Sequence, residues 1–136
     1  MNEIIINKLI KMENYISELE KFKPDTFKEY QNNQLKRYAI ERIIQLIIDL
    51  ALDINNILIK KADRYPAQDY YSSFLELIDL GILSEEFAKD IAPSTGIRNR
   101  LVHEYEEVDN KVVYQNLDKL IKYYLSYIKH VNENIN

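Results

Sequence analysis

RYAIERIIQLIIDLALDIN, residues 37–55, is a stretch that is apolar on more than one face of a helix. Between residues 43 and 58 the only charged side chains are Asp49 and Asp53. A surface helix carries one apolar stripe, whereas a helix that is hydrophobic around most of its girth is surrounded by other elements. We therefore expect a long helix at about 27–61, central in a bundle or also packed against a second subunit.

Amphipathic segments flank this central helix on both sides. Glycine (2) and proline (3) are scarce, so little interrupts the helices, and no segment alternates as a strand does. The sequence therefore predicts one all-α domain over residues 1–136. The apolar residues of the two flanking segments follow helical steps of three and four: Ile5, Leu9, Met12, Ile16 and Leu19, then Val113, Leu117, Leu120, Ile121, Tyr124, Leu125 and Ile128.

Shorter helices are expected between these long ones. Ser72 or Ser73 is expected to open a helix that ends at Gly81, where a left-handed residue fits. Ser84 is expected to cap the following helix, and Pro93 to close it. Five of the eleven tyrosines fit packing or interface roles, because tyrosine is favoured at such contacts: Tyr70, Tyr71, Tyr123, Tyr124 and Tyr127.

The composition excludes several classes of protein. Without cysteine there is no disulfide scaffold, no thiolate metal site and no cysteine nucleophile, and with two histidines we expect no metal and no other cofactor. The most apolar run, residues 43–54, is too short for a membrane span and carries two aspartates. No secretory signal opens the chain, so we expect a cytoplasmic protein that does not contact a membrane. A net charge of −4 argues against broad nucleic-acid binding but permits a local phosphate site.

The stretch GIRNRLVHEYEEVD, residues 96–109, combines groups suited to phosphate chemistry. Histidine exchanges protons near neutral pH, which makes His103 a possible general base. Arg98 is a permanent cation whose planar donors match phosphate oxygens, and Tyr105 offers a hydroxyl and a face for base stacking. A base and a cation suffice in principle to cleave RNA without a metal.

Helix geometry sets a condition on this site. At about 100° per residue, Arg98 and His103 would point about 140° apart on one regular helix, whereas Asn99 and His103 would share a face. A working site therefore needs an irregular helix end, or residues from two chains. Without either, the same residues are ordinary surface groups at the end of a helix.

The residues Arg98-Asn-Arg-Leu-Val-His103-Glu-Tyr105 match the Arg-x-x-x-x-His-x-Tyr signature of the HepT-like toxins of the HEPN superfamily. The resemblance extends over most of the chain. Residues 37–55 resemble the long second helix of that family, and residues 74–109 resemble its central block.

This resemblance implies a HEPN-like helical bundle that forms a homodimer, with the motifs of both subunits meeting in one cleft. It implies the toxin of a type II toxin–antitoxin system, acting as a metal-independent endoribonuclease on an RNA substrate. Arg98 would bind and polarise the phosphate, His103 would transfer the proton, and Asn99 and Tyr105 would support the site. The implied partner is an MntA-type nucleotidyltransferase antitoxin, which would inhibit the toxin by attaching AMP to Tyr105.

Other features of the sequence leave a second function open. Four acids beside the motif, namely Glu104, Glu106, Glu107 and Asp109, would repel RNA unless they face away. The roles of Asp49 and Asp53 are open, between pairing with arginines near the cleft and lining a dimer contact. The alternative to an enzyme is a non-catalytic helical module that binds nucleotide or a nucleotidyltransferase partner. The basic residues that could form a local RNA patch are Arg37, Arg42, Arg64 and Arg100.

Overall fold

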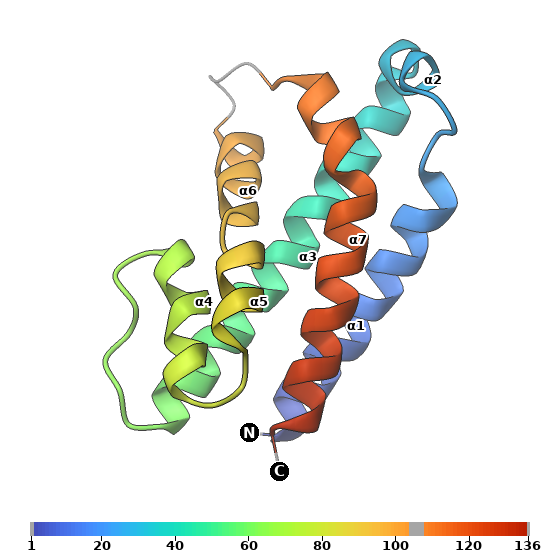
Figure 1. Cartoon of the computed structure of the whole chain (residues 1–136). Coiled ribbons are helices and arrows are strands. Elements are labelled where there is room, and N and C mark those ends of the chain that lie inside the picture. The colour runs from blue at the N-terminus through green and yellow to red at the C-terminus, as the bar shows by residue number, and fades with distance from the viewer. Residues whose placement is uncertain (1, 104–107, 136) are drawn as a thin grey trace.

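The computed structural model describes residues 2–103 and 108–135, and this part of the chain contains helices and no strand (Figure 1). The all-α fold predicted from the sequence is confirmed. No helix in these ranges is both long enough and apolar enough to cross a membrane. The helices are α1 (Asn2–Phe22), α2 (Phe27–Asn32), α3 (Gln34–Lys61), α4 (Tyr70–Asp79), α5 (Glu85–Ile91), α6 (Ser94–Val102) and α7 (Asn110–Glu133).

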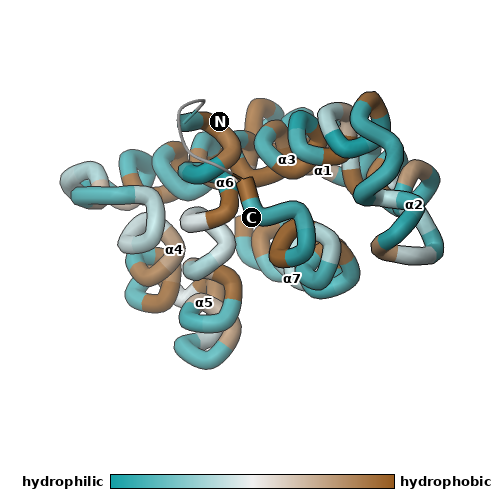
Figure 2. The backbone as a smooth tube through the Cα atoms, turned by 90° about the horizontal axis from the view of Figure 1, so that it is seen from above, coloured by the Kyte–Doolittle hydropathy of each residue, from teal (hydrophilic) through white to brown (hydrophobic). Residues whose placement is uncertain are grey.

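The long helix α1 packs against both α3 and α7, and these three helices form most of the core. All five apolar residues expected on the inner face of α1 are buried. On α7 most of the expected stripe is also buried, with Ile121 and Ile128 partly buried, but Leu125 lies exposed on the outer face, so that assignment is wrong. Seen from above, each long helix alternates between hydrophobic and hydrophilic residues as it turns (Figure 2).

The segment expected to form one helix from about 27 to 61 is divided at Asn33. The backbone of Asn33 leaves the helical conformation at φ −115° and ψ 90°, and its side chain accepts a hydrogen bond from the Lys36 amide at 3.0 Å. An asparagine side chain competes in this way with the helical bonds of the backbone, which favours a cap over a helix interior. The short helix α2 therefore precedes α3, which begins at Gln34.

The helices α4, α5 and α6 lie beside the long helices, with α4 and α6 both packed on α3 (Figure 1). Ser84 caps α5, and Gly81 has the expected positive φ of 74°. The cap of α4 is Asp69 and not a serine, because its carboxylate accepts the Ser72 amide at 2.7 Å. Pro93 stands at the start of α6 and not only at the end of α5, a position that proline tolerates because it needs no amide hydrogen there.

A buried polar cluster joins α3, α4 and α7. The Tyr127 hydroxyl donates to Asn55 Oδ1 at 2.5 Å and is 3.1 Å from the Ala51 carbonyl, while Asn55 Nδ2 donates to Ser73 Oγ at 3.1 Å. Ser73 Oγ in turn donates to the Tyr70 carbonyl at 2.7 Å. Burial raises the pKa of Tyr127, so its hydroxyl stays neutral and keeps its proton for donation. This cluster holds the first turn of α4 at a fixed place on α3.

A second buried pair fixes the start of α6. The hydroxyls of Ser94 and Tyr124 are 2.6 Å apart, and Ser94 Oγ also donates to the Ile91 carbonyl at 2.7 Å. Because Ser94 gives its proton to Ile91, Tyr124 is the donor between the two hydroxyls. The α6 helix is therefore tied to α7 at its first residue and packed on α3 along its length.

The replacement Asn55→Ala is expected to lower the free energy of unfolding by about 1–3 kcal/mol, because it leaves the buried Tyr127 hydroxyl without its nearest acceptor and removes the donor to Ser73. Urea denaturation followed by circular dichroism measures this change. Asn56→Ala, at the neighbouring exposed position, is the control and should change the stability by less than about 0.5 kcal/mol. Equal effects of the two replacements would show that the buried cluster contributes little.

Candidate active site

The end of α6 brings the motif residues to one place. Helix α6 stops at Val102, and His103 adopts an extended conformation with φ −83° and ψ 97°, while its amide still donates to the Asn99 carbonyl at 3.2 Å. On a regular helix His103 would point away from Arg98. Because the helix ends before it, Arg98, Asn99 and His103 line the same pocket. The irregular helix end that the sequence required is therefore present.

This pocket is open and has a volume of about 740 Å³. One wall comes from α6 and the residue that follows it, and the other comes from the loop before α4 and its first turn. Asp69, in the second wall, accepts the Ser72 amide, and this bond lowers the pKa of its carboxyl, so Asp69 is an anion at neutral pH. The lining residues are Gln68, Asp69, Tyr70, Tyr71, Thr95, Arg98, Asn99 and His103.

Arg98 is held from several sides within this pocket. Its Nε donates to Asp49 Oδ1 at 2.7 Å, and its guanidinium carbon lies 4.8 Å from the centre of the Tyr70 ring, within the range of a cation–π contact. The Asn99 side-chain oxygen is 3.4 Å from Arg98 Nη1. Only 18% of the Arg98 side chain is exposed. The one cation of the motif that faces this pocket is thus ordered before any ligand arrives.

Two of the other expected site residues are exposed in the pocket. His103 and Asn99 both lie at the surface, where a ligand that enters the pocket can reach them. Tyr105 lies outside the described residues, and so do Glu104, Glu106 and Glu107 of the acidic flank. The structure therefore brings together three of the four site residues expected from the sequence.

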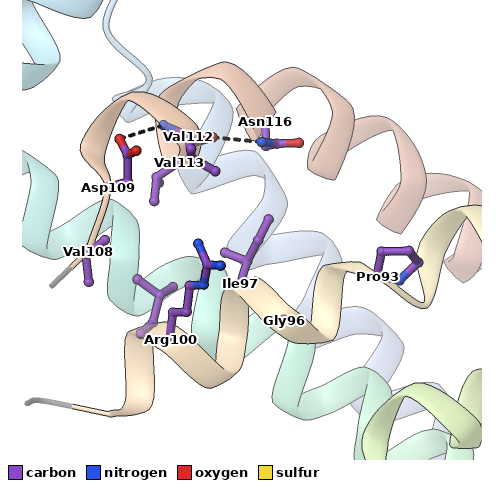
Figure 3. Close-up of a pocket in the computed structure, with 10 residues that line it drawn as sticks. Pro93, Gly96, Ile97, Arg100, Val108, Asp109, Val112, Val113 and Asn116 are labelled. Atoms are coloured by element: carbon purple, nitrogen blue, oxygen red, sulfur yellow. Dashed lines mark hydrogen bonds between the residues drawn. The ribbon is translucent and has the colours of Figure 1, made fainter. Parts of the chain in front are cut away.

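Arg100 faces the other side of α6. It lines a separate groove of about 300 Å³ between α6 and α7, into which its side chain is directed (Figure 3). The walls of this groove include Ile97, Val112 and Val113. The two arginines of the motif thus have different surroundings, and Arg100 does not join Arg98 in the pocket.

The remaining basic candidates are also separated from the pocket. Arg64 lies 3.4 Å from Glu76 and 3.5 Å from Asp79, so acids already balance its charge. Arg37 donates to the backbone carbonyl of Gln31. Arg42 is exposed on α3, seven residues before Asp49 and therefore on the same helix face. Of Arg37, Arg42, Arg64 and Arg100, Arg42 is the one whose position continues the surface around Arg98.

Asp109, the acid of the flank that the structure describes, has a structural role. Its carboxylate accepts the amides of Lys111 at 3.0 Å and Val112 at 3.3 Å and so caps α7 (Figure 3). It lines the groove with Arg100 and not the pocket with Arg98. Within the described ranges, no three acidic or histidine side chains are grouped as a metal ion would need.

Sequence reasoning missed the wall formed by residues 68–71. Tyr70 and Tyr71 fitted packing or interface roles, yet both line the pocket with about two fifths of their surface exposed. Nothing in the spacing of the chain connects residue 70 with residue 98. Asp49, an aspartate in an apolar stretch, was the one signal in the sequence for the groups around Arg98. Pairing of Asp49 with an arginine near the cleft was one of the two roles left open for it.

The chain belongs to the ribonuclease HepT-like family, because the sequence profile of that family matches residues 12–131. The tRNA nuclease HepT of Aphanizomenon flos-aquae strain 2012/KM1/D3 is 34% identical over 129 residues, which cover 95% of this chain and 88% of that protein. The family resemblance found from the motif is therefore confirmed.

Solved structures confirm the HEPN fold. The tri-AMPylated HEPN toxin of Shewanella oneidensis, solved in complex with the MNT antitoxin, superposes with a TM-score of 0.88 at 20% identity and covers 98% of this chain and 99% of its own. YutE of Bacillus subtilis, a cytosolic protein of unknown function, superposes with a TM-score of 0.81 at 20% identity, covering 97% of this chain and 88% of its own. At these identities the likeness concerns the fold alone.

Proposed function

We propose that this protein is the toxin of a type II toxin–antitoxin system and acts as a metal-independent endoribonuclease in the cytoplasm. The observation that carries the proposal is the meeting of Arg98, Asn99 and His103 in one open pocket, in a chain of the ribonuclease HepT-like family. The relative named tRNA nuclease HepT makes transfer RNA the substrate to test first.

The proposed reaction is an internal phosphoryl transfer. His103 takes the proton of a ribose 2′-hydroxyl, and the 2′-oxygen attacks the adjacent phosphorus. The bond from phosphorus to the 5′-oxygen breaks, which leaves a 2′,3′-cyclic phosphate and a 5′-hydroxyl. Arg98 stabilises the negative charge that builds on the phosphate oxygens, and the exposed Asn99 amide orients the same group. No step needs a metal, because the base and the cation both come from side chains.

The leaving 5′-oxygen also needs a proton, and a homodimer would supply a second His103 for it. An exposed face of α3 supports such a dimer. Leu35 and Tyr38 are 82% and 57% exposed, and steps of three and four residues continue this face through Arg42 to Asp49. Tyr38 and Asp49 are roughly 16 Å apart along the helix axis, at 1.5 Å per residue. A second copy on this face would bring two pockets near each other.

The proposed partner is an MntA-type nucleotidyltransferase antitoxin, which attaches AMP to Tyr105. The AMPylated state and the MNT antitoxin of the Shewanella oneidensis toxin support this part of the proposal. Tyr105 follows His103 by two residues in the sequence. A nucleotide added there would put bulk and negative charge where RNA phosphate has to enter, and inhibition follows from that repulsion.

The purified, unmodified protein is expected to cleave transfer RNA in the presence of EDTA. His103→Ala should lower the cleavage rate by about 100- to 10,000-fold, because it removes the proton acceptor, and Arg98→Ala by about 100- to 1,000-fold. Gel analysis of labelled transfer RNA measures both rates. Arg100→Ala is the matched control, since that arginine faces the groove with α7, and its rate should stay close to that of the wild type.

Two outcomes would contradict this part of the proposal. Cleavage that stops in EDTA would require a metal, and cleavage that survives both motif replacements would belong to another protein in the preparation. If the wild type bound a nucleotidyltransferase tightly but cleaved neither transfer RNA nor total RNA, a non-catalytic binding module would replace the enzyme as the function.

Charge placed on the exposed face of α3 is expected to dissociate the dimer. Leu35→Glu and Tyr38→Glu would put carboxylates into a contact that must exclude water, and light scattering coupled to size exclusion should then give the mass of a monomer. Leu125→Glu, which alters an exposed leucine on α7, is the control and should leave the dimer intact. Dimers that persist in both α3 variants would place the interface on another face.

Tyr105→Phe is expected to abolish the addition of AMP while RNA cleavage persists, since the variant lacks the acceptor oxygen but keeps the ring. Intact-mass spectrometry after incubation with ATP and an MntA-type enzyme measures the modification. A Tyr105→Phe variant that still gains AMP would place the acceptor on another residue. His103→Ala, which keeps Tyr105, is the comparison and should still gain AMP.

A further inference from the structure

Asp49 is an acid in an unexpected place. It interrupts the most apolar helix of the chain and stands within 2.7 Å of the guanidinium that the proposed function assigns to phosphate. An anion beside a phosphate site weakens the binding of RNA, because it repels the ligand and neutralises the arginine in part. Some other effect of Asp49 must offset this cost if the site is to work well.

Stability does not offer that compensation. The pair of Asp49 with Arg98 is partly buried, and for such a pair the loss of hydration of both charges offsets much of their attraction, so the pair is weak evidence for a gain in folding stability. Asp53, one turn further along α3, forms a comparable pair with Lys8 at 3.4 Å, away from the pocket. The pair of Asp49 differs from that pair by its shorter distance and by the group that it holds.

The geometry around Arg98 supplies the compensation. Asp49 accepts the Nε–H of Arg98, and the guanidinium carbon lies over the Tyr70 ring, 4.8 Å from its centre. One hydrogen bond to Nε and one contact with an aromatic ring together restrict the movement of the group. One Nη1–H of Arg98 points to the Asn99 side-chain oxygen at 3.4 Å, and the other N–H groups of the two terminal nitrogens are the donors for an incoming phosphate.

The place of Tyr70 is itself fixed by the core. The Ser73 hydroxyl donates to the Tyr70 carbonyl and accepts from Asn55, which is fully buried in α3. Both contacts on Arg98 thus originate from α3, one directly and one through α4. The guanidinium is therefore oriented by groups attached to the buried core and not by the surface loop alone.

We propose that Asp49 and Tyr70 are positioning residues that hold the Arg98 guanidinium in the orientation needed when charge builds on the scissile phosphate. This inference rests on the proposed ribonuclease function. It requires that Asp49 raises the rate of cleavage while it opposes the binding of RNA. Catalytic groups displaced by about 1 Å can lose about 100-fold in rate, so the effect is measurable.

The first experiment separates cleavage from binding in Asp49 variants. Asp49→Ala is expected to lower the single-turnover rate by about 10- to 100-fold. Measured in the inactive His103→Ala background, it should leave the dissociation constant of transfer RNA unchanged or lower it, since an anion has been removed. Asp49→Asn, whose amide oxygen can still accept the Nε–H, should recover most of the rate. Asp53→Asn is the matched control and should match the wild type.

Tyr70 provides a second, independent test. Tyr70→Leu should lower the rate by about tenfold, because it removes the aromatic face over which the cation lies, whereas Tyr70→Phe should keep the rate. Tyr65→Leu, at a 93% exposed tyrosine outside the pocket, should have no effect. Because Tyr70→Phe keeps the ring and loses only the hydroxyl, it shows whether the ring is the part of Tyr70 that supports the rate, and circular dichroism of Tyr70→Leu shows whether that variant is folded.

Nitrogen NMR of the Arg98 Nε–H group tests the positioning without using activity. The proton should exchange slowly with water in the wild type and in Asp49→Asn, and quickly in Asp49→Ala. A loss of RNA affinity in step with the rate, an unchanged or faster rate in Asp49→Ala, or rapid exchange in the wild type would each overturn the proposal. If the Nε proton exchanged slowly in a wild type that cleaves no RNA, the ribonuclease function would be overturned, but the positioning of Arg98 by Asp49 and Tyr70 would stand.

Discussion

Two polar side chains of α3, Asn55 and Asp49, determine where the site lies. Asn55 is fully buried, and a buried amide without partners costs several kcal/mol, so the helices that supply its partners must sit at hydrogen-bond distance. Ser73 of α4 and Tyr127 of α7 meet that requirement. Asp49 lies six residues earlier and about 120° around the helix, and its hydrogen bond to Arg98 holds α6 at a fixed distance from α3. Apolar packing alone would tolerate small shifts of these helices, whereas directional bonds do not.

The pocket follows from this arrangement and from the end of α6. The first turn of α4 and the last turn of α6 are both attached to α3, so the space between them is bordered by Tyr70 on one side and Arg98 on the other. The helix then stops at Val102, and His103 turns away from the helical path into the same space. A helix longer by one turn would carry His103 round to another face. Local irregularity is therefore what converts a linear motif into a site.

The parts of the fold that were predictable depend on local sequence. The buried stripe of α1 follows from spacing alone, and Ser84 caps α5 as expected because its oxygen reaches a free amide of the first turn. The break at Asn33 was missed because the apolar residues on both sides fit one continuous helix. The meeting of Asp49 and Tyr70 with Arg98 was not predictable from spacing, since it depends on how three helices pack. The family resemblance supplied the roles of Arg98 and His103, but it said nothing of the groups that hold Arg98.

Under the proposed function, the charge of the molecule gives a reason for the orientation of one arginine to matter. With a net charge of −4, the surface offers RNA little general attraction, and several of the other arginines are engaged elsewhere or face away from the pocket. A strongly basic nuclease can tolerate a loosely held cation because many others compensate, but this chain has Arg98 as the motif cation in the pocket. Substrate recognition then depends on a few directed hydrogen bonds, which favour the charge distribution of the transition state over that of bound RNA. The same dependence makes such a site sensitive to added negative charge, because one nucleotide monophosphate near the pocket would compete directly for its principal cation.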